Sequence, residues 1–131
     1  MSRKQIREQI FQILFRIEFH NRNEIEEQIF LCLEEFDNLK EKDASYIKDK
    51  VLRIAELLDE IDEMVNTSAE KWKTTRMAKA ELTIIRLAVY EMKYEEEIPV
   101  SVAINEAVEL AKIYGSDNSP GFVNGILAKL A

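Results

Sequence analysis

Residues that interrupt helices are rare in this sequence. Its 131 residues include three glycines and two prolines. Because these two residues destabilise helix interiors most strongly, a chain with so few of them can form long helices joined by short turns. Hydrophobic residues make up 47% of the chain, which is enough to build one core. We therefore predict an all-α fold and a single domain over residues 1–131.

Apolar residues recur at helical spacing along most of the chain. The predicted helices are 3–19, 24–36, 43–65, 76–94, 99–114 and 119–130. The third is expected as one continuous helix, because its apolar residues keep the same register from Ile47 to Val65. The sole tryptophan, Trp72, lies in a polar stretch, and we expect it to fill the joint between two halves of the bundle.

The predicted helix 76–94 is apolar on two sides and leaves only a narrow polar strip. We expect such a helix in the centre of the fold. Two carboxylates, Glu81 and Glu91, project from its apolar arc, and a buried carboxylate is unfavourable unless it is paired. Each should therefore meet a cation or a backbone donor, either in this chain or in a partner.

No pattern of an enzyme active site or a metal site is found in the sequence. The single histidine, His20, has no second histidine or cysteine at ligand spacing. Glycine-rich phosphate loops and the Gly-X-Ser-X-Gly pattern of serine hydrolases are also absent. We expect no catalytic residue, no metal and no cofactor.

Cysteine and hydrophobic content indicate the compartment. The single cysteine, Cys32, cannot form an internal disulfide, which is typical of proteins in a reducing compartment. The basic N-terminus is not followed by an apolar segment, so we expect no signal peptide. Apolar runs are far shorter than the ~20 residues needed to span a bilayer. We predict a cytoplasmic protein that does not contact membranes.

The formal net charge of −7 hides two basic regions. Residues 1–22 contain five basic side chains against two acidic ones, and residues 71–93 contain six against two. Segregated charge allows one face to bind RNA and another to bind a basic protein. Ordinary solvated helix faces would give the same pattern, so charge alone leaves both interpretations open.

The start of the last predicted helix offers a candidate anion site. Ser119 suits the N-cap, and Pro120 suits the first helical position. The N–H groups at a helix N-terminus attract phosphate, and Gly121 lets a phosphate approach the backbone. Phe122 could stack on an unpaired base. The alternative is that Phe122 and Val123 are core residues.

Three segments resemble a known family. Residues 76–91 are RMAKAELTIIRLAVYE, residues 98–112 are IPVSVAINEAVELAK, and residues 122–127 are FVNGIL. In order and spacing these segments resemble the NusB family of transcription antitermination factors. The amphipathic start, with Arg7-Glu8 and Gln12 to Phe15, extends the resemblance over essentially the whole chain.

The resemblance implies a fold and a function. The fold is a compact bundle of six to seven helices in two three-helix-like halves. The function is binding of single-stranded boxA RNA in ribosomal RNA leader transcripts, jointly with the small-subunit ribosomal protein that is also called NusE. The resulting complex joins the elongating RNA polymerase and suppresses termination.

Site residues follow from the same resemblance. In the family, the RNA-binding surface of the protein includes the basic start of the first helix and the start of the last helix. This implies an RNA-binding role for Arg3, Lys4, Arg7, Phe122 and Asn124. The ribosomal protein docks near the central helix, which assigns Glu81, Met77 and Ile84 to the protein partner. Glu81 is the position expected to pair with a basic group.

Two other hypotheses come from different classes. One is a helical scaffold for protein–protein contacts, or a homodimer, without an RNA role. Val102 and Ile113 lie beside Glu106 on the polar side of their predicted helix, where they are candidate exposed apolar contacts. The other is the RNA-binding domain of a methyltransferase. It needs a catalytic domain after Leu127, and we do not expect it because the sequence ends at Ala131.

Overall fold

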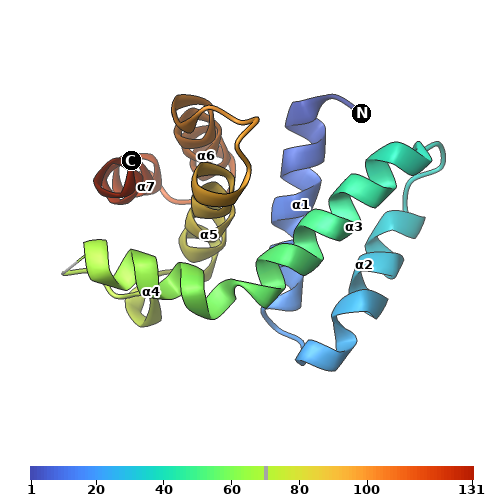
Figure 1. Ribbon diagram of the computed structural model, residues 1–131, viewed down its shortest axis with the longest axis horizontal. Helices are drawn as coiled ribbons and strands as arrows, with labels where there is room; N and C mark the ends of the chain where they lie inside the picture. Colours follow the sequence, from blue (N-terminus) through green and yellow to red (C-terminus); the bar gives the residue numbers. More distant parts are fainter. Residues whose placement is uncertain (70) are drawn as a thin grey trace. The chain divides into compact units, whose positions relative to one another are not determined.

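Every regular element in the described residues, which are all residues except Glu70, is a helix. The computed structural model contains α1 (Arg3–Ile17), α2 (Ile25–Glu34), α3 (Glu41–Glu56), α4 (Leu58–Ser68), α5 (Lys79–Tyr94), α6 (Val100–Tyr114) and α7 (Ser119–Leu130) (Figure 1). Two 3-10 turns, η1 (Arg22–Glu24) and η2 (Thr74–Arg76), precede α2 and α5. The all-α prediction is confirmed. No helix in the described part is long and apolar enough to cross a bilayer.

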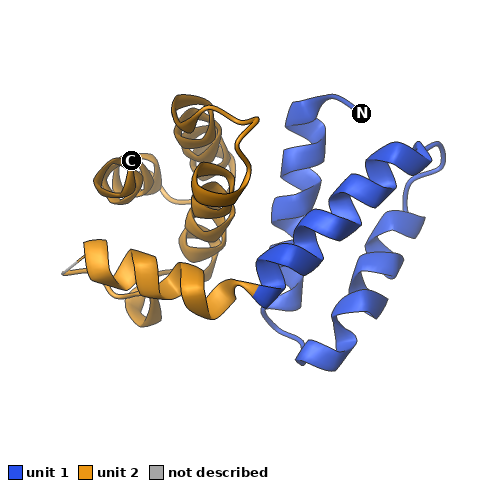
Figure 2. Cartoon of the chain, in the orientation of Figure 1, with its two compact units in different colours: residues 1–56 blue, residues 57–131 orange. Residues whose placement is uncertain are grey.

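The chain divides into two compact units, which Figure 2 shows in blue and orange. Unit 1 is Met1–Glu56 with helices α1 to α3, and unit 2 is Leu57–Ala131 with helices α4 to α7. Each unit is a continuous stretch of sequence. The sequence predicts that both units belong to a single domain, and this stays a prediction.

In unit 1, each of the three helices packs against the other two. Its most deeply buried side chains are aliphatic and come from all three helices: Ile10, Ile13, Ile29, Ile47, Val51 and Ile54. A capping box starts α1, because the Ser2 hydroxyl accepts from the Gln5 N–H at 3.1 Å and the Gln5 side chain accepts from the Ser2 N–H at 2.9 Å. The cap fixes the first turn of the basic helix.

The prediction of one continuous helix over 43–65 is wrong. The helix is interrupted at Leu57, and the two resulting helices, α3 and α4, belong to different units. Leu57 has φ −100° and ψ 6°, which lies outside the helical region. Apolar periodicity runs through the break from Ile54 to Ile61, so the sequence pattern gives no sign of it.

In unit 2, α5 and α7 each contact the other three helices. Half of α5 is buried, as expected for a helix that is apolar on two sides, although it begins at Lys79 rather than at Arg76. The Arg86 guanidinium binds both carboxylate oxygens of Asp62 on α4, at 2.8 and 2.6 Å. At the other end of α5, the Lys93 ammonium donates to the Leu130 carbonyl at 2.6 Å. These bonds fix α5 against α4 and α7.

Candidate nucleic-acid interface

The first turn of α1 places two cations in solvent. Arg3 and Lys4 are exposed, and Arg7 is half-buried one turn further along. Positions 3 and 7 lie on the same face of a helix, so Arg3 and Arg7 point to the same side. The amino group of Met1 pairs with Asp43 of α3 at 3.4 Å, which holds the chain end on unit 1. The basic side chains at the start of α1 thus lie on unit 1, and two of the three are exposed.

The start of α7 is built around a buried serine. The Ser119 hydroxyl, which is 1% exposed, donates to Glu81 Oε2 at 2.6 Å and accepts from the Ser116 N–H at 3.0 Å. It does not cap α7, so the predicted N-cap role of Ser119 is wrong. Asn118 occupies the N-cap position and makes no side-chain bond to the helix. The first N–H groups of α7 are thus not capped by either side chain.

Gly115, just past the end of α6, makes room for this serine. A Cβ atom at position 115 would lie 2.4 Å from Ser119 Cβ and 2.8 Å from the Ala111 carbonyl oxygen. The backbone of Gly115, with φ −99°, suits any residue. The close approach of Ser119 therefore requires glycine here. Gly121 differs, because no atom lies within 4 Å of its added Cβ, and its backbone is open to a ligand.

Phe122 is half-buried at the start of α7, whereas Val123 is fully buried and Asn124 is exposed. Val123 is a core residue, as one alternative proposed, but Phe122 keeps part of its ring at the surface. The ring of Trp72 meets it edge to face, with ring centroids 5.6 Å apart and an angle of 86° between the planes. Trp72 is 52% exposed, so the expectation that it fills a joint in the interior is wrong.

Trp72 is the candidate residue that the sequence analysis missed. The available signal was its place between Lys71 and Lys73 in a polar stretch, because basic residues interleaved with an aromatic one are typical of nucleic-acid surfaces. All three side chains are exposed.

The residues assigned to a protein partner lie at different depths in unit 2. Ile84 is fully buried and Met77 is buried, so only Glu81 is partly exposed. The sequence left open whether Glu81 pairs within this chain or with a partner. In the structure its carboxylate accepts a hydrogen bond from Ser119 of the same chain. Glu91 is buried in α5.

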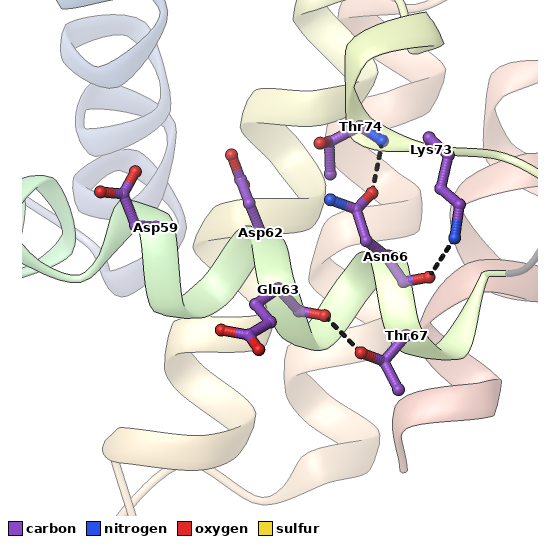
Figure 3. A pocket seen from close by; sticks show the side chains of 7 residues that line it. All are labelled: Asp59, Asp62, Glu63, Asn66, Thr67, Lys73 and Thr74. Carbon is purple, nitrogen blue, oxygen red and sulfur yellow. Dashed lines mark hydrogen bonds between the residues drawn. The ribbon is translucent and has the colours of Figure 1, made fainter.

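A depression of about 420 Å³ lies on unit 2 beside η2 (Figure 3). Its lining is polar and holds three acidic side chains against one basic one: Asp59, Asp62, Glu63, Asn66, Thr67, Lys73 and Thr74. The Asn66 side chain accepts from the Thr74 N–H at 2.8 Å, and the Lys73 ammonium donates to the Asn66 carbonyl at 2.9 Å. Three carboxylates repel phosphate, so this depression is not a candidate RNA site. Its hydrogen bonds instead fix the segment next to Trp72.

Residues 4–131 match the NusB family. A transcription antitermination protein NusB of Agathobacter rectalis is 51% identical over 131 residues, and the alignment covers 100% of both chains. This chain belongs to the NusB family. The NusB protein of Lachnoclostridium phytofermentans is 45% identical over 130 residues, which cover 99% of this chain and 98% of that protein. The chain is therefore an antitermination protein and not an enzyme, as the resemblance implied.

Solved NusB structures share the fold. Thermotoga maritima NusB superposes with a TM-score of 0.86 at 35% identity, covering 100% of this chain and 91% of that one. A crystal structure of the antitermination factors NusB and NusE in complex with dsRNA matches with a TM-score of 0.83 at 24% identity, covering 96% and 92% of the two chains. At that identity the second match shows the fold alone.

Proposed function

We propose that this NusB-family chain binds single-stranded boxA RNA of ribosomal RNA leader transcripts jointly with the small-subunit ribosomal protein NusE. The complex then joins the elongating RNA polymerase in the cytoplasm and suppresses termination. The observation that carries this proposal is the full-length match to NusB antitermination proteins. A NusB chain of the same fold has been solved together with NusE and dsRNA, so RNA and NusE are the kinds of partner that we propose here.

The RNA contacts come from two regions, one in each unit. In unit 1, the exposed side chains of Arg3 and Lys4, with Arg7 behind them, attract phosphates. In unit 2, the partly exposed ring of Phe122 stacks on a base, and the exposed amide of Asn124 hydrogen-bonds to a base edge or a phosphate.

Glu81 supplies the contact to NusE. Its Oε2 atom accepts from Ser119, and a basic group of the partner would bind at Oε1. Met77 and Ile84 act from inside unit 2, where their burial fixes the position of α5. A ribosomal protein suits this site because proteins that bind ribosomal RNA carry basic surfaces.

A binding experiment tests the proposal. The affinity of a boxA-type single strand and of a scrambled strand is measured with and without NusE at several salt concentrations. We expect a preference for boxA that NusE strengthens, and an affinity that falls steeply with salt because phosphate contacts release counterions. Equal affinity for the two strands under all conditions would show that the chain does not read boxA.

A second candidate function is self-association through α6. Val102 and Ile113 are 41% and 56% exposed, and with Glu106 they share one face of the helix. An apolar stripe of this kind suits a homodimer contact. Light scattering of the wild type and of Ile113→Lys distinguishes the two functions. A stable dimer that ignores RNA and that Ile113→Lys dissociates would favour self-association.

A further inference from the structure

Trp72 and Phe122, here called the aromatic pair, are in ring contact on unit 2, and Phe122 is one of the proposed RNA contacts. Both rings reach the surface, and the indole of Trp72 is 52% exposed. In an edge-to-face arrangement, the edge of one ring meets the face of the other, so the two rings do not cover each other's faces completely. The aromatic pair therefore presents π surface to solvent, which an apolar core contact would not do.

The chain directly after each ring of the aromatic pair is held in place. Lys73 and Thr74, directly after Trp72, are hydrogen-bonded to Asn66 of α4 at 2.9 and 2.8 Å. Phe122 is fixed by its neighbour Val123, which is completely buried in the core of unit 2. A ring that is already positioned loses little conformational entropy when a ligand stacks on it. This favours a binding surface that exists before the ligand arrives.

The exposed side chains that flank the aromatic pair in the sequence favour one kind of ligand. Lys71 and Arg76 are exposed and lie within four residues of Trp72 along the chain, and Asn124 is exposed two residues after Phe122. The exposed large aliphatic side chains of unit 2, by contrast, belong to α6. An aromatic surface beside cations and an amide suits an unpaired nucleobase with its phosphate better than an apolar peptide.

We propose that Trp72 is a base-stacking residue, on which an unpaired base of bound RNA stacks next to Phe122 while Lys71 and Arg76 attract the neighbouring phosphates. The inference rests on the proposed RNA-binding function and adds to it a second stacking ring. Successive rings accept successive bases, so Trp72 and Phe122 would stack two neighbouring nucleotides.

Intrinsic fluorescence tests this directly, because Trp72 is the sole tryptophan of the chain. Unlabelled boxA-type single strand is titrated into the wild type with NusE present, and binding is measured in parallel by the anisotropy of an end-labelled strand. We expect the strand to quench the tryptophan emission with the same midpoint as the anisotropy change. A duplex of the same sequence should leave the emission unchanged, because its bases are already stacked.

Variants separate stacking from a merely structural effect. Trp72→Ala should weaken binding of the single strand roughly 10-fold, and Trp72→Tyr should stay within about 3-fold of the wild type because a tyrosine ring also stacks. The matched control is Phe30→Ala, which removes a ring that is 60% exposed on α2, and it should bind as the wild type does. Thermal unfolding of each variant shows whether the fold is intact.

The outcomes are distinguishable. Binding by anisotropy with unchanged emission, or with equal affinity for Trp72→Ala and the wild type, would overturn the stacking role and leave the proposed function standing. Equal quenching by the duplex would overturn it too. Failure of Trp72→Tyr to bind, with its fold intact, would show that a ring at this position does not act by stacking. If no RNA binds the wild type with NusE present, the proposed function and this inference fall together.

Discussion

The Ser119 hydroxyl donates a hydrogen bond of 2.6 Å to the Glu81 carboxylate, and this bond joins the first turn of α7 to the first turn of α5. Glu81 is the residue proposed to contact NusE, and Phe122, three residues after Ser119, is proposed to contact RNA. A partner that attracts the carboxylate of Glu81 thus acts on a group that also positions the start of α7.

Substitutions at Glu81 separate its two roles. Glu81→Ala leaves the buried hydroxyl of Ser119 without its acceptor and should lower the free energy of unfolding by about 2 kcal/mol. Glu81→Gln keeps an acceptor oxygen, so its loss should stay below about 1 kcal/mol. Both variants remove the charge and should weaken NusE binding. Urea unfolding and a NusE binding assay give the two measurements, and unchanged NusE affinity would refute the partner contact.

Gly115→Ala should destabilise the protein. Its Cβ would meet Ser119 Cβ at 2.4 Å, so the α6–α7 connection must shift, at a cost of about 1–3 kcal/mol. Gly125→Ala is the matched control, because nothing lies within 4 Å of its added Cβ in α7. That change should stabilise the helix by about 0.5–1 kcal/mol. Denaturant unfolding of the two variants should give opposite signs, and equal signs would contradict the steric explanation.

Neutralising the start of α1 should weaken RNA binding through electrostatics alone. The double variant Arg3→Gln with Lys4→Gln removes two exposed charges, so stability should change by less than about 0.5 kcal/mol. If both contact phosphates of a single strand, the slope of log affinity against log salt should fall by about 1.4. Lys48→Gln, an exposed lysine of α3, serves as control and should leave the slope as it is. An unchanged slope in the double variant would show that Arg3 and Lys4 do not contact the RNA.

The Asp62–Arg86 pair should stabilise the contact between α4 and α5. Its side chains are 22% and 12% exposed, and the guanidinium contacts both carboxylate oxygens. A double-mutant cycle with Asp62→Ala and Arg86→Ala, measured by urea unfolding, should therefore give a coupling energy of about 1 kcal/mol. A coupling near zero would mean that the two side chains act independently.

Much of the fold follows from local patterns. The helix predicted over 119–130 is found with those bounds, because Pro120 suits the first turn and the apolar residues of α7 face one side. The sequence pattern also predicted the burial of α5, since a helix that is apolar on two sides must be covered on both. The exposure of Val102 and Ile113 was also predicted correctly from their place on the polar side of α6.

The features that the sequence analysis missed depend on contacts between elements. Leu57 interrupts a helix although neither glycine nor proline is near it, because α3 and α4 pack into different units. Ser119 has the residue type of a helix cap, yet its hydroxyl is drawn to Glu81, 38 residues away in the sequence. Trp72 was expected to fill a joint inside the bundle, whereas it is half exposed and contacts Phe122, which is 50 residues away in the sequence.

The division of the chain at Leu57 has a consequence for biosynthesis. Unit 1 ends before unit 2 begins, so none of its helices waits for a segment made later. As the nascent chain leaves the ribosome, α1, α2 and α3 can associate while the rest is still being translated. Contacts that are near in sequence also form quickly. We expect this protein to fold in the order of its synthesis, so that α1 with its basic side chains is in place before the aromatic pair has formed.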